Sequence, residues 1–457
     1  MKFDFSKYRI YDRGYAERPM AFLDLVPAKL LAGIFELALI ETGNRAARDQ
    51  WQKTQLRNLL VHATQRSGFW RSRLGANRPD LEALPILTRM ELRQQVGQEG
   101  SLLRPADGLE TFKNSTSGSS GIPVEFHVSR MNVQYNNVRY LAQEFIEGRD
   151  LSANRTRFKT AKASAAGKLA KTPGGFIVKR NPTWLGDVGL VFKSGSLKNI
   201  ECLTPDTHEL VRELRKDAVG QLIVAPGLLG AIINRSGPKL LRELRVTELL
   251  GFGEAIEPVL QQAIIDQGIP VRSTYSCEEV GPIGFECEIT PGYYHIASSN
   301  VIVELEGLRE IEGKRLGRVL LTHLHSYATP FIRYDVGDLA LLAEGCPCGH
   351  EGPTLHSLYG RETNALKHRD GTFSRFYIRG EEIAEFAECT EFRIRQVGLG
   401  AISIEIGGRE TLAPGEVEGL TAFLRARAGD EFKIDVIARP VIDWGQNTKR
   451  QSFRCEV

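Results

Sequence analysis

Gln221-Leu222-Ile223-Val224-Ala225-Pro226-Gly227 is a short apolar run that stops at a proline and a glycine, and its pattern recurs further along the chain. Glu248-Leu249-Leu250-Gly251-Phe252-Gly253 repeats it, and Val271-Arg272-Ser273-Thr274-Tyr275 is a third strand-like run. Pro258–Asp266, between the second and third runs, has the apolar spacing of a helix. Strands separated by helices predict an α/β fold built on a doubly wound parallel sheet. Ligands of such a sheet bind beyond the carboxyl ends of its strands.

The chain becomes richer in strands after Tyr294. Four closely spaced apolar runs with polar turns between them predict an antiparallel β subdomain: Val301–Glu304, Arg318–Thr322, Phe331–Tyr334 and Leu339–Leu342. Beyond Gly360, alternating runs and one helical segment predict a small α+β unit: Phe392–Val397, Ile402–Ile406, Glu416–Ala428 and Lys433–Ala438. We therefore expect two domains, residues 1–360 and 361–457.

Composition and charge are those of an ordinary globular protein. Of 457 residues 42% are hydrophobic and 25% are charged, and the net charge of +3 argues against a nucleic-acid or anionic-membrane partner. Phe22–Ile40 is apolar but carries three charged residues, so it predicts a packed helix and no membrane span. Further helices are predicted at Asp49–Leu74 and Met131–Glu147. Met1–Tyr8 lacks the apolar core of a secretory signal, and the odd number of cysteines, seven, favours a reducing cytoplasm.

Thr116-Ser117-Gly118-Ser119-Ser120-Gly121-Ile122-Pro123 gathers hydroxyls and glycines directly before the strand-like run Val124–Val128. Glycines let the backbone approach an anion closely, and hydroxyls with free N–H groups can surround phosphate oxygens. The loop is not of the GxxxxGK[ST] type, because no Gly-Lys-Ser/Thr follows. By composition alone a flexible loop is the commoner interpretation, so the phosphate hypothesis depends on the motifs downstream.

Four motifs follow one another along the chain: Thr116–Pro123, Tyr275–Gly281, Phe331–Asp338 and Gly360-Arg361, with Lys449 near the end. In this order they resemble adenylate-forming enzymes, the superfamily of acyl-CoA synthetases, luciferases and peptide-synthetase adenylation domains. The phenylacetate–CoA ligase-like family is the most similar branch, and its capsule-associated relatives resemble the chain most in Tyr275-x-x-x-Glu279-x-Gly281 followed by Gly284–Cys287. N-terminal motifs that also resemble this branch are Leu59–Ala63, Phe69–Arg71 and Pro85–Arg89. The resemblance covers nearly the whole chain.

The resemblance implies a phosphate site. Its loop residues, Thr116, Ser117, Gly118, Ser119, Ser120 and Gly121, would grip the leaving phosphates of ATP. Glu279 would hold the Mg²⁺ that bridges them, since hard oxygen ligands suit this ion. The family often has lysine where this chain has Ile122, so Lys113 or magnesium would supply that charge.

The remaining motifs imply the rest of the nucleotide site. Tyr275 would stack on adenine, and Asp338 would accept both ribose hydroxyls. Arg361 would reach ribose or phosphate from the hinge between the domains. Lys449 would be the catalytic lysine, delivered when a mobile C-terminal domain closes. Gly253, Glu254 and Ser276 would lie beside the nucleotide.

Each of these side chains also has an ordinary structural interpretation. Glu279, Arg361 and Lys449 could be solvated surface charges, Tyr275 a core residue and Asp338 part of a hairpin turn. The chain also departs from the family pattern, because Ser276 and Glu278 replace a glycine and a serine or threonine, and Thr363-Asn364 replaces acidic residues. The ordered set carries the prediction, and no single residue does.

The acid is expected to bind near Tyr135, Tyr140, Ala225, Pro226, Gly227, Gly251 and Phe252, which do not define its size or polarity. The acyl acceptor is expected to be the thiol of coenzyme A, while a carrier-protein thiol or an amine would need the same first step. The basic stretch Lys159–Arg180 could face an anionic acceptor or be a solvated insertion. A non-catalytic nucleotide-binding relative and a zinc-dependent hydrolase are the other classes left open, as is a homodimer.

Cysteine and histidine spacing predicts a metal site. Cys287 precedes His295 at C-x7-H, and Cys346-Pro347-Cys348-Gly349 supplies two more thiols. Four such ligands suit tetrahedral structural Zn²⁺, although C-x-C is tighter than the usual C-x2-C. His350 is a substitute ligand, and four unrelated side chains are the other interpretation. The resemblance implies that branch members with similar cysteines and histidine hold zinc there.

Overall fold

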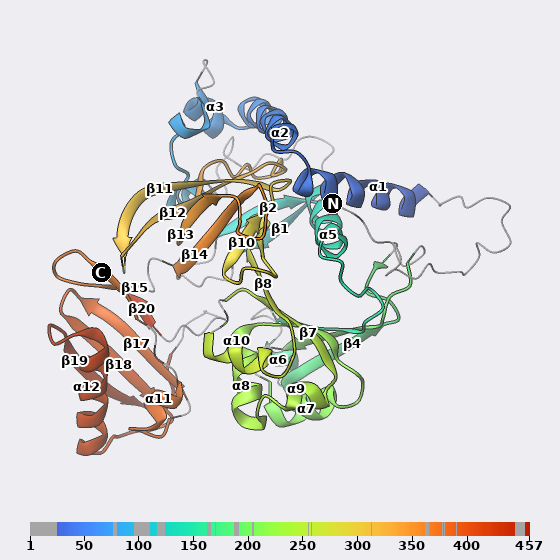
Figure 1. Ribbon diagram of the computed structural model, residues 1–457. Helices are drawn as coiled ribbons and strands as arrows, with labels where there is room; N and C mark the ends of the chain where they lie inside the picture. The colour runs from blue at the N-terminus through green and yellow to red at the C-terminus, as the bar shows by residue number, and fades with distance from the viewer. Residues whose placement is uncertain are drawn as a thin grey trace.

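The chain folds around one large mixed sheet with a smaller sheet near its C-terminus (Figure 1), the α/β class that the sequence predicts. This computed structural model describes residues 25–75, 80–95, 110–116, 124–161, 166–169, 171–186, 192–202, 205–254, 256, 258–311, 313–361, 365–376, 378, 380–389, 391–443 and 453–457. Among the helices it describes, none combines the length and the apolarity needed to cross a membrane.

The N-terminal part is helical, with α1 at Leu25–Thr42, α2 at Arg45–Arg66 and α3 at Gly68–Leu74. The single helix expected over Asp49–Leu74 is divided at Ser67. Ser67 has an extended backbone (φ −127°, ψ 123°), and its hydroxyl accepts the N–H of Trp70 at 3.2 Å. It therefore ends α2 and caps α3.

A turn of 3₁₀ helix, η2 (Leu81–Ala83), precedes α4 (Arg89–Gln95). The Thr88 hydroxyl accepts the N–H of Glu91 at 3.2 Å, and the Glu91 carboxylate accepts the N–H of Thr88 at 2.9 Å. This reciprocal capping box fixes the start of α4 at Thr88.

The large sheet has the strand order β11-β12-β13-β14-β10-β9-β8-β7-β6-β3-β5-β4. Its strands are β3 (Arg155–Thr160), β4 (Phe176–Asn181), β5 (Leu197–Cys202), β6 (Gly220–Val224), β7 (Val246–Phe252), β8 (Val271–Cys277), β9 (Gly281–Glu286), β10 (Tyr293–Ile296), β11 (Val301–Ile311), β12 (Lys314–His323), β13 (Tyr334–Glu344) and β14 (Pro353–Arg361). β3 and β5 to β8 run parallel, and the other pairs are antiparallel. The sequence predicts a parallel sheet and a separate antiparallel subdomain. In the structure β9 pairs antiparallel with β8, so the two form one continuous sheet.

Phe331–Arg333 is not a strand, contrary to the expectation from its apolar run. Arg333 has a left-handed backbone (φ 48°). Its guanidinium donates to the carbonyl oxygen of Glu82 at 2.9 Å and pairs with Glu304 at 3.1 Å. These contacts bend the chain, so β13 begins only at Tyr334.

Helices cover both faces of the parallel strands. On one face lie α7 (Thr207–Leu214), α8 (Pro226–Ser236), α9 (Leu240–Glu243) and α10 (Pro258–Ile265). Their apolar side chains share a core with Phe158, Ile200 and Leu222 of the sheet. On the other face α5 (Arg130–Ile146) packs against α1, and its Glu144 pairs with Arg155 of β3 at 2.8 Å. Figure 1 shows the α7–α10 group and α5 separated by the strands.

The remaining elements are short or C-terminal. β1 (Thr111–Ser115) and β2 (Glu125–Ser129) form a hairpin, while α6 (Ala166–Leu169) and η4 (Pro173–Gly175) precede β4 in the chain. After β14 come β15 (Ala365–Lys367), β16 (Phe373–Arg375), α11 (Gly380–Ala384), β17 (Glu391–Gly398), β18 (Ala401–Gly407), α12 (Pro414–Ala428), β19 (Lys433–Arg439) and β20 (Phe453–Cys455). The sheet β19-β18-β17-β20 has its own apolar core with α12. A domain boundary after residue 360 stays a prediction.

Candidate nucleotide site and cysteine cluster

The base of the Ser/Gly loop is held by three hydrogen bonds. The N–H of Thr116 donates to the carbonyl of Val124 at 3.0 Å, and the N–H of Val124 donates to the Thr116 hydroxyl at 3.0 Å. Arg89 of α4 also donates to this hydroxyl, at 2.5 Å. The rest of the loop, Ser117 to Pro123, lies outside the described residues. The hairpin β1–β2 therefore fixes both ends of the loop and brings a guanidinium to its base.

Lys113, one of the two expected replacements for the missing lysine, is directed elsewhere. Its ammonium pairs with Glu125 across the hairpin at 3.4 Å, and 70% of its side chain is exposed. Arg89 was not singled out from the sequence, although it ends the motif Pro85–Arg89. Its approach to Thr116 joins residues 27 positions apart, a long-range contact that no local pattern reveals.

Tyr275, Asp338 and Arg361 come together from three strands. The Tyr275 hydroxyl donates to Oδ2 of Asp338 at 2.7 Å, and Asp338 and Arg361 are partners in the register of β13 and β14. The Tyr275 ring also packs in the core, edge-on to Tyr294 at 6.4 Å. The predicted adenine and ribose residues are thus neighbours. The side chain of Arg361 lies outside the description, as does all of Lys449.

Glu279 borders a small hollow that β2 lines on one side. Its carboxylate accepts the hydroxyl of Tyr334 at 2.8 Å and is only 7% exposed. Burial and the Glu279 carboxylate raise the pKa of Tyr334 well above its usual value, while Arg89 acts in the opposite direction. Thr116, Arg89, Tyr334 and Glu279 therefore form a continuous set of neighbours. The sequence predicts Glu279 as a site residue but not Tyr334, whose apolar run predicts only a strand.

The hollow is lined mainly by oxygen- and nitrogen-bearing side chains: His127, Ser129, Asn132, Glu279, His325, Ser326, Tyr327 and Thr329, with Val128, Ala328 and Phe331. The amide oxygen of Asn132 is buried and has no hydrogen-bond partner among the described residues. An unpartnered carbonyl-type oxygen beside a carboxylate is a donor set that suits Mg²⁺. The residues present therefore fit this ion.

The strand ends expected to face the acid also meet. Val224 pairs with Gly251 in the register of β6 and β7, so Ala225 and Phe252 follow at adjacent strand ends. A Cβ at Gly227, in the first turn of α8, would lie 3.3 Å from Oε2 of Glu254. Gly253 has φ +77°. Glycines at these positions leave room where the two strands end.

Tyr135 and Tyr140 lie at different places on α5. The Tyr135 ring stacks on His325 (4.8 Å between centroids, 20° between planes), beside the hollow. The Tyr140 ring meets Phe285 edge-on at 6.1 Å. Its hydroxyl is surrounded by enough protein to raise its pKa to about 12, although 42% of the residue is accessible. The two tyrosines therefore do not line one surface.

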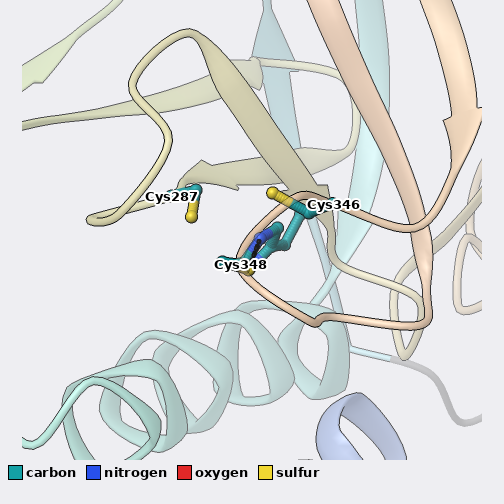
Figure 2. A group of neighbouring side chains, drawn as sticks. Cys287, Cys346 and Cys348 are labelled. Carbon is teal, nitrogen blue, oxygen red and sulfur yellow. Dashed lines mark hydrogen bonds between the residues drawn. The ribbon is translucent and has the colours of Figure 1, made fainter.

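The four predicted zinc ligands converge. The ligand atoms of Cys287, His295, Cys346 and Cys348 all lie within 4.8 Å of one another, and Cys348 Sγ is 3.4 Å from His295 Nε2. Figure 2 shows Cys287 after one strand and Cys346 and Cys348 on a neighbouring loop. All three cysteines are free thiols. Burial lowers the pKa of His295, which favours the neutral ring that a metal ligand needs.

His350, the substitute ligand, is not part of this group. Its ring stacks on His295 at 4.2 Å and 17°, and its carbonyl accepts the N–H of Cys346 at 2.8 Å. It therefore supports the ring of one ligand and the loop of another. Three thiols and one imidazole at this spacing fit a tetrahedral zinc ion.

No family model and no curated protein sequence matches the chain. Solved structures match over nearly its whole length. A 2-hydroxyisobutyryl-CoA ligase in the postadenylation state, in complex with 2-HIB-AMP, has 18% identity and a TM-score of 0.62, covering 92% of this chain and 91% of that chain. The same ligase with 2-HIB-AMP and CoA in the thioesterification state has 17% identity and a TM-score of 0.55, covering 91% of each chain.

The acyl acid amido synthetase AtGH3.15, in complex with 2,4-DB, also matches. It has 12% identity and a TM-score of 0.55, covering 96% of this chain and 95% of that chain. At such identities the likeness concerns the fold. The chain has the fold of adenylate-forming ligases, as the motif order predicted.

Proposed function

We propose that this chain uses ATP to activate a carboxylic acid as an acyl-adenylate, releasing pyrophosphate, and then transfers the acyl group to coenzyme A. One observation carries the proposal. The Tyr275–Asp338 pair, whose aspartate is the register partner of Arg361, and the set Thr116–Arg89–Tyr334–Glu279 provide groups suited to a nucleoside and to its phosphates. The fold supports the same reaction by analogy only.

The reaction explains these residue types. A carboxylate and an α-phosphate are both anionic, so a site that joins them must neutralise charge and hold the two in line. Arg89, at the loop base, would balance phosphate charge where the family uses lysine. Glu279, with the Asn132 oxygen near it, would hold Mg²⁺, which when bound screens the phosphate oxygens from the incoming carboxylate. Lys449 would complete the site when the C-terminal unit closes.

Coenzyme A is the acceptor that we favour. The 2-hydroxyisobutyryl-CoA ligase, the match with TM-score 0.62, binds CoA in another of its structures. Amide formation with an amine is a second candidate, supported by the likeness to an acyl acid amido synthetase. A carrier-protein thiol would serve in the same step. A cytoplasmic location and membership of the phenylacetate–CoA ligase-like branch remain predictions from the sequence.

We assign a structural role to the cysteine cluster and propose that it holds one Zn²⁺. Cys287 follows β9, His295 lies in β10, and Cys346 and Cys348 lie between β13 and β14. Zinc would fasten these strands together at the turn between β13 and β14, the end of this hairpin opposite to the Asp338–Arg361 pair. A complete set of four protein ligands leaves no open position for a substrate.

ATP–pyrophosphate exchange without coenzyme A tests the proposal directly. The wild-type protein would be assayed with a panel of aryl, short-chain, amino, hydroxy and dicarboxylic acids, with Glu279→Gln as the inactive control. We expect acid-dependent exchange that this substitution abolishes. Folded protein that binds ATP but exchanges with no acid would instead indicate a non-catalytic relative. Coenzyme A or an amino acid is then added to the activated acid, and the mass of the product, measured by mass spectrometry, identifies the acceptor.

A further inference from the structure

Arg155 and Arg157 are alternate residues of β3 and project from the same face of the sheet, toward α5, but their partners differ. Arg155 is fully engaged: it pairs with Glu144 at 2.8 Å, donates twice to Gln221 Oε1 and lies 3.6 Å from the centroid of the Trp184 ring. Arg157 donates from Nε to Asn199 Oδ1 at 2.9 Å. No carboxylate in the described part of the chain forms an ion pair with it.

Arg157 borders the surface expected to hold the acid. In the register of β3 and β6 it is the partner of Ile223, two residues before Ala225 at the strand end. On the opposite side lies Tyr140, one helical turn before Glu144. The Tyr140 phenol is close enough to Arg157 and to Glu278 for both charges to act on its pKa. Arg157 thus lies between the sheet and α5, set back from the strand ends.

The surroundings of Arg157 favour an anionic ligand. Burial and the charge of Arg155 both lower its pKa, because each disfavours the charged form that it keeps at neutral pH. Lys159, two residues along β3, and Lys179, in the same register row across Asn199, add positive charge. Glu201, opposite Lys159, is the carboxylate in this register. A half-buried guanidinium without a counter-ion is costly, and a carboxylate that accepts two of its N–H groups removes that cost.

We propose that the acid activated by this protein carries a second anionic group, a carboxylate, and that Arg157 binds it. The inference rests on the proposed function. One carboxylate would lie at the strand ends, where the adenylate forms, and the other would lie back along β3 between Arg157 and Tyr140. We assign the anion to the acid and not to the acceptor because an acceptor arriving from solvent would meet the exposed Lys159 and Lys179 first.

The test compares acids matched in length that differ only at the far end: succinate with butanoate, glutarate with pentanoate, and adipate with hexanoate. In ATP–pyrophosphate exchange, we expect at least one diacid to exceed its partner in kcat/KM by about 10-fold or more. Arg157→Gln should lower kcat/KM for that diacid by about 100-fold and leave the monoacid within about threefold. Arg157→Lys should restore part of the preference for the diacid, since lysine keeps the positive charge but lacks the planar guanidinium that donates two N–H groups to one carboxylate. Arg180→Gln is the matched control, because Arg180 projects from the opposite face and pairs with Glu213 and Asp217.

Three results would overturn the inference. One is a wild-type protein that activates the monoacid as well as the diacid. Another is an Arg157→Gln variant that loses both acids equally. The third is an Arg157→Gln variant that changes only the KM for coenzyme A, which would place the anion in the acceptor.

Absence of ATP–pyrophosphate exchange with every acid would contradict the proposed function. Calorimetric measurement of diacid binding then tests the anion site at Arg157 separately. The same diacids would be titrated into protein saturated with a non-hydrolysable ATP analogue. Binding that Arg157→Gln abolishes and Arg180→Gln preserves supports the anion site. The anion site is contradicted if the wild-type protein binds no diacid, or if both variants bind the diacid as the wild type does.

Discussion

The hydroxyl of Tyr275, at the end of β8, donates a 2.7 Å hydrogen bond to Oδ2 of Asp338, which lies 63 residues later in β13. An ionised carboxylate has about four acceptor positions, and the Tyr275 hydroxyl occupies one of those of Asp338. The phenol thereby orients the carboxylate while its ring packs against Tyr294. One side chain links the apolar core to the predicted ribose site.

Tyr275→Phe should weaken ATP binding by about threefold to tenfold, because it keeps the ring and removes the hydrogen bond that orients Asp338. Calorimetric titration with ATP measures the effect. Tyr294→Phe is the matched control, since it removes a hydroxyl from the same core away from Asp338. An unchanged ATP affinity in Tyr275→Phe would show that Asp338 needs no orientation by the phenol.

Arg89→Gln should lower kcat/KM for ATP–pyrophosphate exchange by about 100-fold, because it removes a positive charge from the base of the loop that would hold the phosphates. Lys113→Gln makes the comparison decisive. Lys113 is exposed and pairs with Glu125, so we expect its loss to change the rate by less than about threefold. The reverse ranking would return the phosphate charge to Lys113.

The parallel strands and their ends follow from local sequence. β6, β7 and β8 are apolar runs bounded by glycine or proline, and such runs have few alternatives to a buried strand. The bend at Phe331–Arg333 could not be predicted in the same way. It depends on the hydrogen bond from Arg333 to Glu82, 251 residues earlier in the chain, and short-range periodicity cannot predict such a contact.

In the candidate site, too, the sequence predicts residues that belong to motifs and misses residues whose role depends on long-range contacts. The motif order selects Glu279 and Asp338, and the spacing of three cysteines and one histidine selects the four metal ligands. Arg89 and Arg157 were missed because their significance lies in what surrounds them. Arg89 matters through Thr116. Arg157 matters because Arg155, two residues away, has a carboxylate partner, whereas Arg157 has none among the residues that the structure describes.

Lys449→Ala should abolish acyl-adenylate formation and leave ATP binding nearly unchanged, because this lysine would act only after the C-terminal unit closes. Exchange assays and ATP titration on one preparation separate the two effects. Lys433→Ala, at the start of β19, is a control for the loss of a C-terminal lysine. Exchange at the wild-type rate in Lys449→Ala would remove this residue from the mechanism.

His325 should make the protein less stable in mild acid. Burial and the nearby Arg139 lower its pKa to about 4, and its ring lies between Tyr135 and the carbonyl of Ser299. The unfolded chain takes up this proton near pH 6.5, so the stabilisation is complete above that pH and is lost as the pH falls toward 4. Between pH 7.5 and 5 this histidine should cost about 2 kcal/mol of unfolding free energy.

Urea titrations at several pH values measure this slope. His325→Phe, which keeps the stacked ring, should flatten it, whereas His208→Gln, at an exposed position in α7, should not. Arg139 and His323 also face His325, and burial lowers the pKa of His323 as well, so part of the slope should remain. A slope identical in wild type and His325→Phe would mean that the ring is protonated in the folded state.

Removal of the metal should separate stability from catalysis. Elemental analysis should find about one zinc per chain, and chelation should lower the melting temperature, because Cys287 and the Cys346–Cys348 loop would lose the ion that joins them. Cys346→Ser should reproduce that loss, while Cys389→Ser, outside the cluster, should not. Below the melting temperature the chelated protein should still catalyse exchange, since the ligand set is complete without substrate. Chelation that abolished catalysis in a protein with unchanged melting would instead make the zinc a catalytic ion, and the turn between β13 and β14 would then need another explanation for its stability.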